Sequence, residues 1–156
     1  MKIVKKILWF LLLVFSIAQF FGPEKNEGEI KTLNVFLAET NPNEQVKQIL
    51  KESCFDCHSD KTRYPWYFNI TPVNYWIADH IEHGKGDLNF SEWETYSLKK
   101  KEHKMEEVWE EVKKKEMPLE SYTWTHSEAK LTDEQIEAVV NWAKGIQENY
   151  KQQLNK

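Results

Sequence analysis

Cysteine is scarce in this chain, which has two cysteines in 156 residues. Both lie in the stretch CFDCH, where Cys54 and Cys57 are three positions apart and His58 follows at once. A disulfide between them would close a loop of only a few residues, and so short a loop removes little entropy from the unfolded chain. A structural disulfide is therefore a poor explanation of the pair.

Strand patterns and internal repeats are also lacking. No stretch alternates apolar and polar residues convincingly enough for a strand, and helical patterns recur instead. The sequence therefore predicts an all-α fold with long loops. Residues 41–150 have the size of one domain, and six of the seven tryptophans lie there to supply a core.

Basic residues are not in excess. The formal net charge is −4, and loss of Lys2, Lys5 and Lys6 with a signal peptide would lower it by three units to −7. Because phosphate backbones repel an acidic protein, nucleic acid is not expected as a partner. The same acidity favours a redox partner protein with a basic surface.

The one long apolar run extends from Ile7 to Phe21 near the N-terminus and is preceded by three lysines. It is shorter than the roughly 20 residues that a spanning helix usually needs. Ser16 and Ala18 supply small residues for cleavage after Ala18. A cleaved signal peptide is thus one expectation for residues 1–21.

The other expectation is an uncleaved membrane anchor, because aromatic residues at both ends of the run suit a membrane interface. Residues 22–40 contain glycine, proline and charges and are expected to be a tether. Either outcome predicts that the domain lies in the periplasm or on the outer side of the inner membrane.

Three further chemistries use two cysteines at this spacing. A thioredoxin-like pair belongs at the start of a helix, whereas here the predicted helix precedes the cysteines. A zinc site could add His80 and His83, although their spacing is tight and His58 would have no role. Covalent attachment of haem uses both thiols and places the histidine as an axial ligand of the iron. The pattern favours one covalently attached haem c.

Start and stop signals predict several helices in the domain. These signals are Asn41 with Pro42 for a helix before CFDCH, Thr71 with Pro72 and a stop at Gly84 for the next, Pro118 after the charged run 99–117, and a capping box of Thr132 and Gln135 for the last helix.

The chain resembles the small monohaem c-type cytochromes with a haem-binding domain that occur in bacterial envelope proteins. The matching stretches are CFDCHSDKTRYPWYFNITPV, HIEHGKGDLNFSEW, MPLESYTWTHSEAKLT and NWAKG. The resemblance implies a cytochrome c-like helical domain around one haem, and single-electron transfer. An alternative is a peroxidase-like enzyme or a haem sensor, in which the distal ligand of the iron would be exchangeable.

Met117 is the first candidate for that distal ligand. It precedes Pro118, where the chain must leave a helix and can present a thioether from a loop. Met105, by contrast, belongs to the apolar stripe of a charged helix, so packing explains it. His103 has charged neighbours and is expected to face water.

Three histidines are rivals of Met117. His80 and His83 lie three positions apart on one predicted helix, and His126 lies near the Met117 loop. Among the residues after the motif, donors for a haem propionate are expected from Arg63, Trp66 and Tyr67.

Overall fold

The structure is a computed structural model that describes residues 2–29 and 32–156. Within these residues the fold is helical, and the only β pairing is an isolated bridge between Glu27 and Lys61. The helices are α1 (Lys2–Ala18), α2 (Leu33–Thr40), α3 (Glu44–Ser53), α4 (Phe55–His58), α5 (Val73–Asp87), α6 (Leu98–Lys114), α7 (Glu120–Thr123) and α8 (Asp133–Leu154), with 3₁₀ helices at Trp66–Asn69, Phe90–Thr95 and Ser127–Ala129. The all-helical prediction is confirmed for the described residues.

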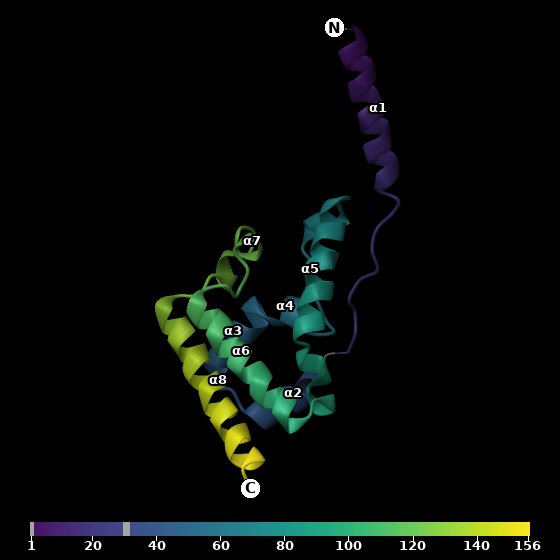
Figure 1. The fold of residues 1–156 in the computed structure, drawn as a ribbon. Coiled ribbons are helices and arrows are strands. Elements are labelled where there is room, and N and C mark those ends of the chain that lie inside the picture. The colour runs from purple at the N-terminus through teal and green to yellow at the C-terminus, as the bar shows by residue number, and fades with distance from the viewer. Residues whose placement is uncertain (1, 30–31) are drawn as a thin grey trace.

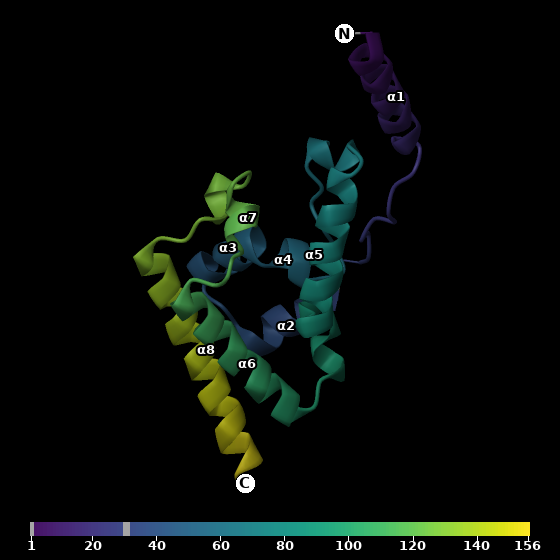
Figure 2. The ribbon, with the colours of Figure 1, turned by 45° about the horizontal axis from the view of Figure 1, so that its top comes forward.

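The two longest helices of the domain, α6 and α8, pack side by side and form one wall of the fold (Figures 1 and 2). Met105 and Val112 of α6 and Val139 and Ala143 of α8 are buried between them and the rest of the core. The stripe predicted for the charged run is therefore real. This stripe faces α8, and α8 in turn packs on α3.

Capping explains where these helices begin. The predicted capping box of α8 is present, with Thr132 Oγ1 accepting from the backbone N–H of Gln135. The predicted cap of α3 is wrong, because Asn41 instead ends α2 with a left-handed backbone, φ 40°. Asn43 caps α3 by accepting a hydrogen bond from the Val46 backbone.

Helix α5 does not stop at Gly84 as predicted but continues to Asp87. Its predicted cap, Thr71, bonds elsewhere, since the Thr71 hydroxyl donates to the carbonyl of Phe21. Gly84 serves a different purpose inside the helix. A Cβ at this position would lie 2.9 Å from the carbonyl oxygen of Cys57, so glycine allows α5 to pack directly on α4.

The segment predicted as a tether, residues 22–40, is partly a helix of the core. Phe36 of α2 is fully buried, and its ring contacts those of Phe90 and Trp93 at centroid distances of 4.4 and 5.1 Å. The stretch before α2 is also bonded to the domain. Asn26 donates through Nδ2 to the Ser59 carbonyl, and the Gly28 backbone donates to Asp60. The apolar patch of this segment is short and surrounded by charges, so its burial could not be predicted from the local pattern.

Helix α1 stands apart from the domain, with its large apolar side chains exposed (Figure 1). Among the helices of the described residues, none is both long and apolar enough to cross a membrane. The expectation of a signal peptide or an anchor at residues 1–21 stays a prediction.

Replacement of Phe36 by Ala should lower the free energy of unfolding by roughly 3–5 kcal/mol, because it leaves a cavity among the buried rings. Urea denaturation of the purified protein measures this. The matched control is Val35→Ala, at a residue that is 36% exposed on the same helix, which should cost less than about 1 kcal/mol. Equally small effects of both changes would show that α2 is not part of the core.

Candidate functional site

The CFDCH motif forms a short turn of helix between α3 and the loop that follows. Helix α3 ends at Ser53, and α4 covers Phe55–His58. Phe55 is buried against the rings of Phe36 and Phe90, so it ties the motif to the core. The two cysteines are free thiols and only partly buried.

His58 is held in a defined orientation. Its Nδ1 lies 2.9 Å from the carbonyl oxygen of Leu88, just beyond the end of α5. Because a carbonyl oxygen only accepts, Nδ1 carries the proton and Nε2 keeps its lone pair. Burial, the largest effect, lowers the pKa of His58 below its ordinary value, which favours the neutral ring. Nε2 is therefore ready to bind a metal ion.

The thiols do not suit thioredoxin-like chemistry. Burial raises the pKa of Cys54 to about 12, with a smaller effect of Cys57. Burial and then the charge of Asp56 raise the pKa of Cys57 to about 11. A redox-active pair needs a lowered thiol pKa, so that the attacking thiolate is populated at neutral pH. Both shifts favour the protonated thiol.

Three adjoining cavities surround the motif. The α7 cavity, about 320 Å³, lies beside Cys57 between α5 and α7. The central cavity, about 350 Å³, is lined by Cys57, His58 and Met117. The α6 cavity, about 370 Å³, is lined by Cys54, His58 and Met117. Neighbouring cavities share lining residues, and each has the size of a cofactor pocket.

Large apolar side chains remain exposed at the edge of this space. Trp76 of α5 and Trp124, just after α7, both line the α7 cavity and are 47% and 73% exposed. Exposed tryptophans beside a cavity are typical of a ligand site. A flat aromatic cofactor would cover them.

The distal candidates differ in their place around this space. Met117 lines both of the cavities that contain His58. His80 and His83 line the central cavity but not the α6 cavity. Their Nδ1 atoms donate to backbone carbonyls of α5. His126 lines the α7 cavity alone, stacked on the Tyr122 ring at 4.1 Å.

Met105, predicted to pack in the core, and His103, predicted to face water, line none of these cavities. Met105 is fully buried in the hydrophobic core. His103 is on the surface, with Nε2 3.1 Å from a carboxylate oxygen of Glu107.

A Cys2His2 zinc site is not assembled. Within residues 2–29 and 32–156 there is no group of three or more His, Cys, Asp or Glu side chains placed to hold a metal ion. His80 and His83 therefore do not join Cys54 and Cys57 around a common centre.

The predicted propionate donors lie after the motif but have different surroundings. Arg63 and Tyr67 line the α7 cavity, whereas Trp66 is 75% exposed and packs against the Tyr67 ring. The Tyr67 hydroxyl lies 2.8 Å from Thr125 Oγ1. A propionate contact for these three residues stays a prediction.

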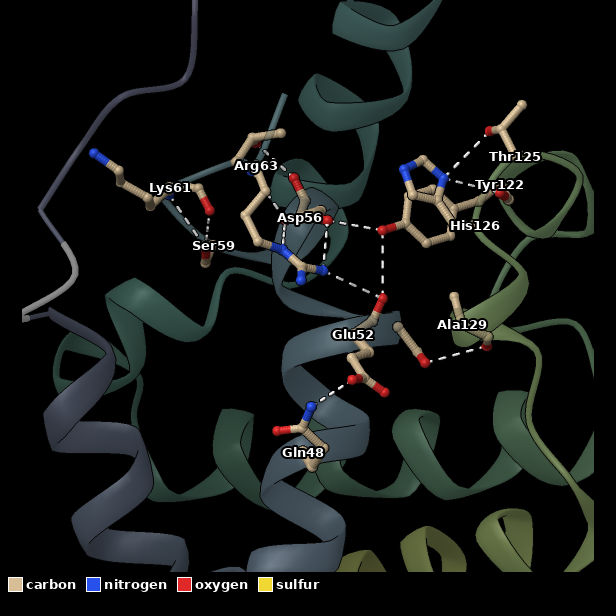
Figure 3. Close-up of polar contacts among 12 residues, drawn as sticks. Gln48, Glu52, Asp56, Ser59, Lys61, Arg63, Tyr122, Thr125, His126 and Ala129 are labelled. Carbon is tan, nitrogen blue, oxygen red and sulfur yellow. Dashed lines mark hydrogen bonds and ion pairs between the residues drawn. The ribbon is translucent and has the colours of Figure 1, made fainter. Parts of the chain in front are cut away.

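Sequence reasoning missed a polar cluster centred on the buried Asp56 of the motif (Figure 3). The side chain of Asp56 is 8% exposed and forms a two-point ion pair with Arg63, whose Nε and Nη2 donate at 3.1 and 2.9 Å. The Tyr122 hydroxyl donates to the same carboxylate at 2.7 Å. Burial and then the hydrogen bond to Asp56 raise the pKa of Tyr122 far above its usual range. No local signal could find this contact, because Tyr122 is distant in sequence.

Comparisons with known proteins agree with a cofactor site at Cys54, Cys57 and His58. A family model described as the haem-binding domain matches residues 13–145, which is most of the chain. Searches of curated proteins and of solved structures found no match. The match includes CFDCH, the cavities around it and Met117. The chain belongs to the haem-binding domain family.

Proposed function

We propose that this haem-binding protein is an exported monohaem c-type cytochrome that carries single electrons in the bacterial cell envelope. One observation carries the proposal: both thiols and the free Nε2 of His58 adjoin one set of cavities large enough for a cofactor. Haem supplies the one-electron chemistry through its iron, and the protein tunes it by ligands, burial and hydrogen bonds.

Cys54 and Cys57 are the residues that would attach the haem. Each thiol would supply its sulfur to one carbon of a haem vinyl group and its proton to the other. No oxidant or reductant is needed. Because Gly84 lets α5 pack closely on the carbonyl of Cys57, the backbone of the second cysteine is held against α5 beside His58. This rigidity suits a motif in which all three residues must meet the same haem.

His58 and Met117 are the proposed axial ligands. His58 is backed by the Leu88 carbonyl, which fixes the ring and increases the basicity of Nε2. Met117 comes from the segment after α6 and lines both cavities that contain His58. A thioether on that segment can therefore approach from another side of the same space. Ligation by histidine and methionine favours ferrous iron and a higher potential than two histidines would.

The same site supports one rival function. His80 lines both the α7 cavity and the central cavity, so it could act beside an exchangeable sixth position. A peroxidase-like enzyme or a sensor would need such an open position. We propose an electron carrier, with no enzymatic activity, because Met117 adjoins His58 in two cavities and would close that position.

The proposed setting is the periplasm or the outer side of the inner membrane, with a redox partner protein whose surface is basic. The charged N-terminus and the apolar run of α1 support export. The formal charge of −4 supports a basic partner and argues against nucleic acid.

Replacement of both Cys54 and Cys57 by Ala should remove all haem colour from the protein band on a denaturing gel. The chain has no other cysteine that could hold the haem. The matched control is Ser53→Ala next to the motif, which keeps both thiols and should keep the colour. A wild-type band without colour, after expression with a working maturation system, would disprove covalent attachment.

Replacement of Met117 by Ala should open the sixth position, lower the redox potential and admit carbon monoxide, with the haem still attached. The shift should be a fraction of the roughly 0.8 V range that axial ligands control. Optical spectra and a redox titration measure this change. The control, Met105→Ala, should lose stability through its buried side chain but keep the spectrum.

The opposite result would come from a haem with two histidine ligands. The Met117 variant would then keep its low-spin spectrum and potential, and a His80→Ala or His83→Ala variant would lose them.

A further inference from the structure

Residues 117–123, here called the Met117 segment, are tied to the domain at both ends. At the first end the backbone N–H of Met117 donates to the carbonyl of Glu111, at the end of α6. At the second end the Tyr122 hydroxyl lies 2.7 Å from Asp56 Oδ2 and 3.3 Å from the Glu52 carbonyl. Within the described residues, Tyr122 makes the only hydrogen bonds that join this segment to α3 and α4.

The acceptor of that bond, the Asp56 carboxylate, is buried and accepts several other hydrogen bonds. Asp56 lies within the motif, between the two cysteines, and its side chain is 8% exposed. Arg63 donates to it from the backbone N–H at 3.0 Å as well as from the guanidinium (Figure 3). A buried carboxylate with fixed donors cannot turn to follow a moving partner. The bond from Tyr122 therefore ties the Met117 segment to the haem attachment motif.

The segment borders the cavities beside His58. Tyr122 lines the α7 and central cavities, and Met117 lines the central and α6 cavities. The chain between them, with Pro118 and Leu119, lines the central cavity as well. If the end at Tyr122 were released, no hydrogen bond would join the segment itself to α3 or α4, and the next ties along the chain would be those of Thr125 to Tyr67 and of Ala129 to Ser53.

We propose that Tyr122 is a positioning residue, which through its hydrogen bond to Asp56 holds Met117 at the iron and keeps the sixth position closed to outside ligands. This inference rests on the proposed function. Removing the Tyr122 hydroxyl leaves the buried Asp56 carboxylate without one of its hydrogen-bond donors. A hydrogen bond to a charged group contributes about a tenfold change in an equilibrium constant. That change should appear in the balance between bound and released Met117.

The test is the affinity of the ferric holoprotein for imidazole, measured by optical titration. Tyr122→Phe should bind imidazole about tenfold more tightly than the wild type, because imidazole must displace Met117. The matched control is Tyr150→Phe. Tyr150 also donates to a carboxylate, at 2.6 Å from Glu39 Oε1, but it lines none of the three cavities. That variant should leave the imidazole affinity unchanged, even if it lowers stability.

A double variant separates positioning from simple access to the cavity. In a Met117→Ala background there is no thioether to position, so adding Tyr122→Phe should change the imidazole affinity less than about twofold. An equal increase in both backgrounds, or no more increase for Tyr122→Phe than for Tyr150→Phe, overturns the inference. If Met117→Ala alone fails to open the sixth position, the proposed ligand is wrong and the inference falls with it.

A second variant covers the case in which Tyr122→Phe does not fold. Asp56→Asn keeps the shape of the acceptor but removes its charge. Like Tyr122→Phe, it should therefore bind imidazole more tightly than the wild type does. An Asp56→Asn holoprotein with wild-type imidazole affinity would also overturn the inference.

Discussion

The hydrogen bond from Nδ1 of His58 to the carbonyl of Leu88 is the contact on which the site depends. It fixes both the tautomer and the direction of the ring, so that the lone pair of Nε2 is available to a metal. The bond in turn requires that the end of α5 lie behind the motif. Gly84 makes this possible, because any Cβ there would meet the backbone of Cys57.

The rest of the fold keeps that arrangement in place. Phe55 lies between Cys54 and Asp56 in the motif and packs on Phe36 of α2 and Phe90, so the CFDCH turn is part of the aromatic core. The α6 and α8 pair supports this core from one side, and α6 delivers the Met117 segment at its end (Figure 2). The candidate site thus lies where the CFDCH turn, the end of α5 and the segment after α6 meet.

Local patterns predicted much of this from the sequence. CFDCH, the stripe of α6 and the capping box of α8 are each signals formed by residues close together in the sequence. The role of Met117, inferred from its place before Pro118, stays a prediction. Contacts between distant residues left no such signal. The Asp56–Tyr122 bond joins positions 66 residues apart. Gly84 was misread as a helix stop because the same residue type serves both chain reversal and close packing.

The most direct test of this account is the position of the iron in a crystal structure of the mature holoprotein, found by anomalous scattering. We predict iron bound to Nε2 of His58 on one side and to the sulfur of Met117 on the other, with Nδ1 of His58 still bonded to the Leu88 carbonyl. Iron bound instead by His80 or His83, or no iron within bonding distance of His58, would contradict the account.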